Sequence, residues 1–476
     1  MTALSRALGR PAQLEDIPDA ELDGWAGKGF DWVWLLGVWQ TGAAGQALAR
    51  GNLDWRRDWQ KVLPDLDDSD IWGSCFAITD YQVHSRLGGN VALAGLRQRL
   101  RQRGLRLMLD FIPNHTAIDH PWAELHPDFY VEGSESDLAR APSSYTRVGT
   151  RGGSRVVAHG RDPNFPAWSD TLQLDYSSSQ VREAMLGELL RAAAMCDGVR
   201  CDMAMLILPE VFERTWGIAS QPFWPEAILR VRQDFPDFLF LAEVYWGLEG
   251  SLQQQGFDCT YDKHLYDRLR DGEARPVREH LGRGLDFQNK LARFLENHDE
   301  PRAATVFAPG KHQAAAVLTF LSPGMRFFHQ GQLQGARKQL PMQLARAPLP
   351  PKDPELSRFY ERLLAELQRS ALREGDWHLL EAAPAWEGNP TWDNFVAFAW
   401  RGPDGGQLWV TVNYAESRGQ CYVRLPFPDL SGWKWRLADR MSEASYEREG
   451  DPLLASGLYL DLPEWGYHVF EVRRDG

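Results

Sequence analysis

Cysteine is scarce in this sequence and follows no pairing or metal-binding pattern. The chain has 476 residues and five cysteines, an odd number that is scattered from Cys75 to Cys421 without a C-x-x-C pair. This spacing argues against a disulfide framework and against a zinc site. Reduced thiols are typical of cytosolic proteins, so we expect a cytoplasmic location.

Long apolar runs and basic runs are also lacking. No stretch approaches the roughly 20 apolar residues that a membrane-spanning helix needs, and the first residues, MTALSRALGRPAQLED, hold no signal-peptide core. The formal net charge is −13, and the arginine-rich stretch at 96–103 fits the solvated face of a helix. We therefore expect neither a membrane nor a nucleic acid as a partner; the oligomeric state is left open.

A parallel α/β fold is predicted for the first three quarters of the chain, although one strand is lacking. Short apolar strands alternate there with helical stretches. The candidate strands are 32–36, 105–111, 198–203, 238–244, 257–261, 291–296 and 325–329. A TIM-type (β/α)8 barrel needs eight. The residues before Trp32 offer a polar segment and a helix-like run at 17–28, so the first barrel strand is not evident. We expect either that residues 1–16 cover the gap or that a natural N-terminus with a strand precedes this chain.

The domain organisation follows from two changes of pattern. Residues 116–170 interrupt the alternation with proline, glycine and serine, which predicts a long functional insertion after the third barrel strand. After a helix at 354–369 the pattern becomes two-residue alternation, which predicts a β-sandwich. The predicted domains are a barrel at 1–115 and 171–373, an inserted B domain at 116–170, and a C-terminal β-sandwich domain at 374–476.

Polar residues suited to catalysis follow four of the candidate strands. The carboxyl ends of barrel strands carry the reacting groups, so these side chains are expected to converge. A single acid at a strand end is more often a helix cap or an ion-pair partner, but joint occurrence at four strands favours a catalytic site. The candidates are Asp110, Asn114 and His115, then Arg200 and Asp202, then Glu243 and Tyr245, and finally Asn297, His298 and Asp299.

Two of these segments suggest specific roles. Arg200 and Asp202 are two residues apart and so project from the same side of an extended strand, where the arginine can keep the carboxylate ionised as a nucleophile requires. Glu243 follows the apolar run FLFLA, a setting that raises a carboxyl pKa and suits a general acid.

The four segments, in this order, resemble the α-amylase family, glycoside hydrolase family 13. The family pattern D-x-x-x-N-H matches residues 110–115, G-x-R-x-D matches 198–202, the isolated strand-end acid matches Glu243, and N-H-D matches 297–299. The stretches GFDWVWLLGVW, TDYQVHSRLGG and FFHQGQ add weaker matches. The resemblance covers essentially the whole chain, including an inserted B domain and a C-terminal β domain.

The resemblance implies a retaining mechanism and a role for each candidate. Asp202 matches the nucleophile, Glu243 the acid/base, and Asp299 the carboxylate that assists by binding sugar hydroxyls. The implied sugar contacts or orienting residues are Phe76, His115, Arg200, Tyr245 and His298, with Asp110, Asn114 and Asn297 in support.

Three positions depart from the family pattern. Ala77 stands where many exo-acting α-glucosidases have an acid, and the residues after Asp202 lack the Lys-His pair of typical endo-amylases. The family's calcium uses the asparagine at 114 and an acid where this chain has Gln173. A neutral amide there leaves at most a weak calcium site near Asn114, and we expect no other cofactor.

Three functions remain open at this point. The first is a retaining hydrolase acting on α-glucosidic bonds of oligosaccharides, so that the partner is an α-linked glucose oligosaccharide or glucoside. The second is an α-glucan transglycosidase, of glucanotransferase or sugar isomerase type, with the same three acids. The third is a catalytically inactive sugar-binding protein, which the presence of all three acids disfavours.

Overall fold

The computed structural model describes residues 1–349 and 352–475, which form two compact units. Unit 1 contains Met1–Tyr261 and Leu340–Leu349, and unit 2 contains Asp262–Gln339 and the described residues from 352 onward. The predicted domain ranges also include residues 350, 351 and 476, which lie outside the described residues.

Parallel strands form the centre of unit 1. They neighbour one another in the order β1 (Trp32–Trp34), β4 (Arg106–Phe111), β9 (Gly198–Cys201), β10 (Leu239–Ala242) and β11 (Cys259–Tyr261). Every residue of β9 and β11 is buried, as is typical of parallel strands that are covered on both faces. Unit 2 holds a further parallel pair, β12 (Leu291–Arg293) and β13 (Met325–Arg326). All seven strands expected from the sequence are therefore present.

Helices accompany these strands in both units. Their amphipathic spacing explains their burial: α8 buries Val181, Met185 and Leu189, and Ser178 caps its first turn. The helices of unit 1 are α1 (Thr2–Leu8), α2 (Asp19–Gly27), α3 (Ala43–Gly51), α4 (Leu53–Val62), α5 (Gly89–Arg101), α6 (Pro121–Leu125), α7 (Glu135–Arg140), α8 (Ser179–Met195), α9 (Pro209–Trp216), α10 (Trp224–Asp234) and α11 (Glu249–Gln254). Those of unit 2 are α12 (Lys263–Asp271), α13 (Ala274–Leu281), α14 (Leu285–Gln288), α15 (Ala303–Val306), α16 (Pro309–Phe320), α17 (Pro354–Leu367), α18 (Ser370–Glu374) and α19 (Gly450–Ser456).

The residues that precede β1 are helical. Residues 1–31, all of which the structure describes, form α1, α2 and a short 3-10 turn at Leu14–Asp16, and none of them is in a strand. The 3-10 turn is held against α5, because Arg99 donates to the carbonyl oxygen of Glu15 at 3.2 Å. The helix expected near residues 17–28 is thus present as α2.

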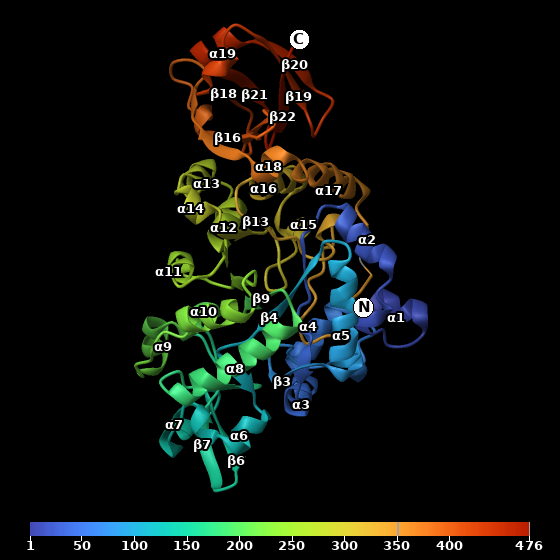
Figure 1. Cartoon of the computed structure of the whole chain (residues 1–476), viewed down its shortest axis with the longest axis vertical. Helices are drawn as coiled ribbons and strands as arrows, with labels where there is room; N and C mark the ends of the chain where they lie inside the picture. The colour runs from blue at the N-terminus through green and yellow to red at the C-terminus, as the bar shows by residue number, and fades with distance from the viewer. Residues whose placement is uncertain (350–351, 476) are drawn as a thin grey trace. The chain divides into compact units, whose positions relative to one another are not determined.

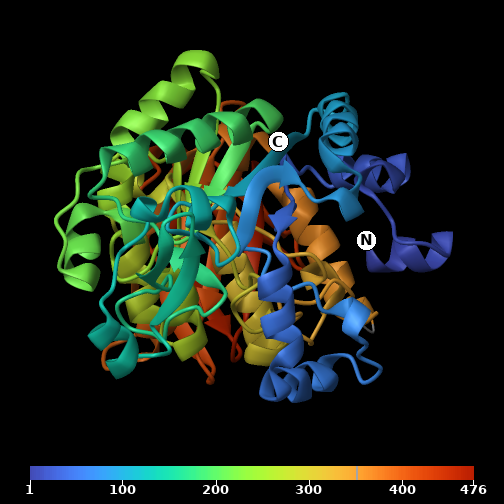
Figure 2. The ribbon, with the colours of Figure 1, turned by 90° about the horizontal axis from the view of Figure 1, so that it is seen from below.

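The segment after the third barrel strand contains regular structure that its composition did not reveal. A short antiparallel pair, β5 (His115–Ala117) and β8 (Thr171–Gln173), joins its two ends. Between them, β6 (Tyr145–Thr150) and β7 (Gly153–Ala158) form a hairpin that lies beside α6 and α7 (Figure 1, Figure 2). A further antiparallel pair of unit 1 is β2 (Trp39–Thr41) with β3 (Ile78–Val83).

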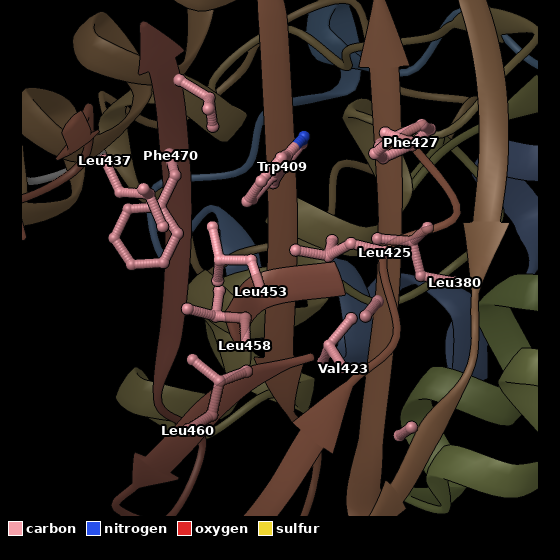
Figure 3. Close-up of a cluster of buried hydrophobic side chains, with 14 of the residues drawn as sticks. Leu380, Trp409, Val423, Leu425, Phe427, Leu437, Leu453, Leu458, Leu460 and Phe470 are labelled. Carbon is pink, nitrogen blue, oxygen red and sulfur yellow. The ribbon is translucent and has the colours of Figure 1, made fainter. Parts of the chain in front are cut away.

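Two antiparallel sheets form the C-terminal part of unit 2. The first has the order β14 (Asp376–Leu380), β16 (Phe395–Arg401), β17 (Gln407–Asn413), β22 (Tyr467–Arg474), β19 (Lys434–Asp439) and β20 (Ser445–Glu449); the second is β15 (Ala382–Pro384), β18 (Gly419–Val423) and β21 (Leu458–Leu462). A buried apolar cluster draws on both sheets, with Trp409 and Phe470 from the first and Val423 and Leu460 from the second (Figure 3). This packing of two sheets on one core is that of the predicted β-sandwich.

The helices of this protein do not resemble membrane spans. Within residues 1–349 and 352–475, none combines the length and the apolar character that crossing a bilayer would require.

Candidate active site

Asp202 directly follows β9 and is buried. Its backbone N–H donates to the carbonyl oxygen of Phe111 at 2.8 Å, which ties the end of β9 to the end of β4. Its carboxylate lies 2.7 Å from Nη1 of Arg200. The strand alternation that places residues 200 and 202 on one side of β9 therefore produces a direct ion pair.

Glu243 directly follows β10 and is held by four contacts. Its backbone N–H donates to the carbonyl oxygen of Cys201 at 3.0 Å. The backbone N–H of Met203 donates to Oε2 at 2.7 Å, and the hydroxyl of Tyr245 donates to Oε1 at 2.9 Å. Arg200 Nη2 lies 2.6 Å from Oε2. One guanidinium thus bridges the carboxylates of two neighbouring parallel strands.

Aromatic rings surround the guanidinium of Arg200, which is fully buried. The distances from its Cζ to the ring centroids are 5.3 Å for Trp34, 5.2 Å for Phe76 and 5.9 Å for Tyr261. Such rings attract a cation through their π faces and exclude water from it. The arginine is therefore fixed in place and cannot swing away from the two carboxylates.

Asp110 is a third buried carboxyl beside the same arginine. It lies 3.6 Å from Nη1 of Arg200 and accepts hydrogen bonds from the backbone N–H of Gly37 at 2.7 Å and from Nε1 of Trp34 at 3.2 Å. Burial raises its pKa to about 7 against the opposing effects of Arg200 and the Gly37 N–H. Asp110 thus approaches the same nitrogen of Arg200 that Asp202 contacts.

One cation faces three carboxyl groups in this cluster. Burial raises the pKa of Asp202 and of Glu243, and the charge on Arg200 opposes the rise in both. The neighbouring Asp202 raises the pKa of Glu243 further. Three negative charges next to one positive charge are costly when buried, so the arrangement favours a proton on one of the three carboxyls.

His115 lies on β5, at the root of the insertion. Its ring is 5.1 Å from the ring of Trp168, which belongs to the inserted segment. Burial lowers the pKa of His115 to about 4, so the imidazole is neutral near pH 7 and can both donate and accept a hydrogen bond.

Asn114 and Gln173 form hydrogen bonds with each other, so their side-chain oxygens are already engaged and are not free to bind a metal ion. Nε2 of Gln173 donates to both the carbonyl oxygen and Oδ1 of Asn114 at 3.0 Å, while Nδ2 of Asn114 donates to Oε1 of Gln173 at 3.2 Å. Both side chains are buried. Since a calcium ion takes six to eight oxygen ligands, often carboxylates, this amide pair does not fit it. Over the described part of the chain, no group of three or more His, Cys, Asp or Glu side chains could hold a metal.

The N-H-D segment lies in unit 2, after β12. Oδ1 of Asn297 accepts from the backbone N–H of Asp299 at 2.9 Å and of Glu300 at 2.7 Å. Nε2 of His298 lies 3.1 Å from Oδ2 of Asp299. Gln339 donates to the carbonyl oxygens of His298 and Asp299 at 2.8 and 2.9 Å. Asn297 and Gln339 thus fix the backbone that carries the other two side chains.

Comparison with known proteins relates this chain to α-amylases. A model of the α-amylase catalytic domain matches residues 67–150. Alpha-amylase MalA of Haloarcula japonica is 25% identical over 271 residues, which cover 55% of this chain and 36% of MalA. The crystal structure of a noncanonic maltogenic α-amylase, AmyB from Thermotoga neapolitana, superposes with a TM-score of 0.68 over 95% of this chain and 93% of AmyB, at 17% identity.

The chain is thus similar to α-amylases in sequence and in fold. The predicted fold class, a (β/α)8-type barrel with an insertion and a C-terminal β-sandwich, is confirmed by the likeness to AmyB. Trehalose synthase of Pimelobacter sp. is also similar, with 26% identity over 244 residues that cover 42% of this chain and 40% of that enzyme. The matched stretches thus span well under half the length of MalA and of the trehalose synthase.

Some residues of the candidate site were not anticipated from the sequence. Trp34 and Tyr261 contact Arg200, and the backbone N–H of Met203 contacts Glu243. Trp34 and Tyr261 do lie on predicted strands, and that position was the one signal the sequence offered for them. The amide of Met203 has no signal in the sequence, because every residue except proline has one.

Proposed function

We propose that the protein is a retaining glycosidase that cleaves α-glucosidic bonds of oligosaccharides. The observation that carries this proposal is the pair of carboxyl groups, Asp202 and Glu243, which end adjacent parallel strands and share Arg200. Retaining enzymes need two such carboxyls, one ionised and one protonated, about 5–5.5 Å apart. The charge balance around Arg200 supports that division of roles.

In the first half-reaction, an Asp202 oxygen attacks the anomeric carbon from the face opposite the leaving group. Glu243 gives its proton to the glycosidic oxygen as the bond to the anomeric carbon breaks. The products are a β-glycosyl ester on Asp202 and the leaving saccharide, which now carries a free hydroxyl group in place of the glycosidic bond. Tyr245 and the Met203 amide keep the Glu243 carboxyl directed while it loses its proton, since both donate to the anionic form.

In the second half-reaction, Glu243 acts as a base. It removes a proton from water, the oxygen attacks the anomeric carbon, and the ester bond to Asp202 breaks, which restores both carboxyl groups. In our proposal Asp299 and His298 bind sugar hydroxyls as the ring flattens toward the oxocarbenium ion. We also assign sugar contacts to Phe76 and to the neutral His115.

The stereochemistry of the product follows from these two displacements. We expect the first sugar released from an α-glucoside to have the α configuration, because two inversions at the anomeric carbon restore it. NMR of the anomeric proton within the first minutes, before mutarotation, measures this outcome. A β product at early times would rule out the retaining mechanism.

Transglycosylation is the second candidate function, and the similarity to a trehalose synthase favours keeping it. The two functions differ only in whether water or a sugar hydroxyl attacks the glycosyl ester. A product screen on maltooligosaccharides, sucrose, trehalose and aryl α-glucosides separates them. Shorter products alone indicate hydrolysis, while longer or isomeric products indicate transfer. No product from any substrate would favour an inactive sugar-binding protein.

Calcium is not part of the proposed mechanism, and this leads to a prediction. We expect EDTA to change the melting temperature little, because the amide of Gln173 already donates hydrogen bonds to the oxygens of Asn114 that would otherwise bind calcium. Gln173→Asp replaces that amide with a carboxylate and removes its donated hydrogen bonds. This variant should be less stable in EDTA and should regain stability on addition of Ca²⁺, as thermal unfolding would show. A large EDTA effect on the wild type, reversed by Ca²⁺, would contradict the prediction.

The expected location stays part of the proposal. The structure describes all five cysteines and joins none of them in a disulfide, and Cys196, Cys201, Cys259 and Cys421 are buried. Buried thiols accord with a reducing compartment, and we propose a cytoplasmic enzyme.

A further inference from the structure

One segment of unit 1 comes from far along the chain. We call Leu340–Leu349 the strap, because it belongs to unit 1 although Gln339 before it belongs to unit 2. The strap packs on residues 63–77, the loop that connects α4 to β3. Leu344 of the strap is buried in a small apolar cluster whose other buried members come from α3, α4 and this loop. They are Ala49, Trp59, Leu63 and Ile71.

One arginine adds polar contacts to this packing. Nε and Nη2 of Arg346 each lie 2.7 Å from an oxygen of the Asp70 carboxylate, and Nη1 lies 3.0 Å from Oδ2 of Asp65. The backbone N–H of Ala345 donates to the carbonyl oxygen of Asp70 at 2.8 Å. Paired hydrogen bonds between a guanidinium and a carboxylate fix geometry as well as adding energy. Both carboxylates belong to the 63–77 loop, so one guanidinium holds the strap and the loop together.

The strap also contacts the residue that holds the backbone of Phe76. The hydroxyl of Ser74 donates to Sδ of Met342 at 3.6 Å and accepts from the backbone N–H of Phe76 at 3.2 Å. The ring of Phe76 lies 5.2 Å from Cζ of Arg200. A hydrogen bond from His115 to the Phe76 backbone opposes the lowering of the His115 pKa by burial. A short path of contacts therefore leads from the strap to two residues that we assign to sugar binding.

We propose that Arg346 is a positioning residue, which fastens the strap to the 63–77 loop and so holds Phe76 ready to contact the sugar. A binding residue that is ordered in advance gives a higher affinity than one that must be ordered by the ligand. Arg200 is held separately by its carboxylates and by Trp34 and Tyr261, so loosening Phe76 should leave the reacting acids in place. This inference rests on the proposed function, and it concerns affinity for the sugar.

The test removes the guanidinium without touching any residue assigned to the sugar or to the chemistry. In Arg346→Gln we expect KM for the best substrate of the product screen to rise about fivefold while kcat stays within about twofold, as when uniform binding is lost. In a Phe76→Ala background the ring is already absent, so Arg346→Gln should raise KM by less than about twofold. An equal rise of KM in both backgrounds, or no rise in either, would overturn the inference, because Arg346 would then not act through Phe76.

Hydrogen exchange tests the contact between strap and loop without any substrate. In Arg346→Gln, amides of the 63–77 loop should exchange about tenfold faster than in the wild type, because the loop opens more often. Arg10→Gln is the matched control. Arg10 pairs with both oxygens of Asp16 at 2.7 and 2.6 Å elsewhere in unit 1, so its loss should change neither KM nor the exchange of the loop.

Melting temperatures establish that each variant is folded. Unchanged exchange of the loop in Arg346→Gln, or an equal change in Arg10→Gln, would overturn the inference. Inactivity of the wild type on every substrate of the screen would contradict the proposed function instead, and the exchange result would still show whether Arg346 fastens the strap to the loop.

Discussion

Replacement of Asp202 by asparagine is expected to abolish turnover while the protein stays folded. Asparagine has nearly the same size, and the strand-to-strand hydrogen bond at this residue uses the backbone N–H, which the substitution retains. The side-chain amide cannot form the glycosyl ester. Loss of a nucleophile lowers the rate by about three orders of magnitude or more. The measurement is kcat on the best substrate found in the product screen, together with the melting temperature.

Asp237→Asn serves as the control for this change. Asp237 is exposed in the loop before β10, so its substitution should leave both kcat and the melting temperature close to the wild type. Activity above a few per cent of wild type in Asp202→Asn would show that another group is the nucleophile.

Replacement of Arg200 by methionine should have the largest effect on stability. Methionine fills a similar volume but leaves Asp110, Asp202 and Glu243 without the cation that faces all three. Removing one partner of a buried ion pair costs about 3–5 kcal/mol, because the remaining charge is buried without compensation. Urea unfolding of both proteins measures the difference in free energy of unfolding.

The same substitution at an exposed ion pair provides the comparison. Arg230 pairs with Asp234 on the surface of α10, and Arg230→Met should change the free energy of unfolding by less than about 1 kcal/mol. If Arg200→Met were as stable as Arg230→Met, the guanidinium would not be compensating the three carboxyls.

The destabilisation of Arg200→Met should depend on pH in a definite direction. Burial already raises the pKa of Asp110 to about 7, and without Arg200 the pKa values of all three carboxyls rise further. When a carboxyl has a higher pKa in the folded than in the unfolded state, the free energy of unfolding is highest below the unfolded-state pKa. It falls as the pH rises through the folded-state pKa, because the folded protein then has to hold a buried negative charge. The deficit of the variant relative to wild type should therefore be smaller at about pH 5 than at about pH 8.

Strand periodicity makes the local part of the site predictable. Alternation along an extended chain predicts that Arg200 and Asp202 project from one side, and the 2.7 Å contact between them agrees with that reasoning. The apolar run that precedes Glu243 likewise predicts a buried carboxyl; Glu243 is buried, and burial raises its pKa. Both inferences depend on neighbours within a few residues, which the sequence displays directly.

Contacts between distant segments could not be predicted in the same way. That Arg200 also pairs with Glu243, and that Trp34 and Tyr261 cover it, depends on which strands lie adjacent and in what register. For the hairpin β6–β7 the sequence offers only part of the signal, which is a glycine-containing turn between the segments YTRVGT and SRVVA. Most residues of these segments are polar or exposed, so they do not show the alternation of a strand with one buried face.

Strand β20 of the sandwich likewise has no hydrophobic pattern in the sequence. All five residues of β20, SYERE, are exposed, so hydrophobic patterning has nothing to detect there. Strand β20 forms because it pairs with the edge of β19, a contact between strands that hydrophobic patterning does not reveal.

The backbone amide of Met203 bears on how substrate preference can change in evolution. Because residue 203 donates to Glu243 through its peptide N–H, the side chain at position 203 can be exchanged without loss of that hydrogen bond. Proline alone would abolish it, and the φ of 41° favours residues such as glycine and asparagine. The loop that begins there can therefore diverge in shape and charge while the two carboxyls proposed to be catalytic keep their positions.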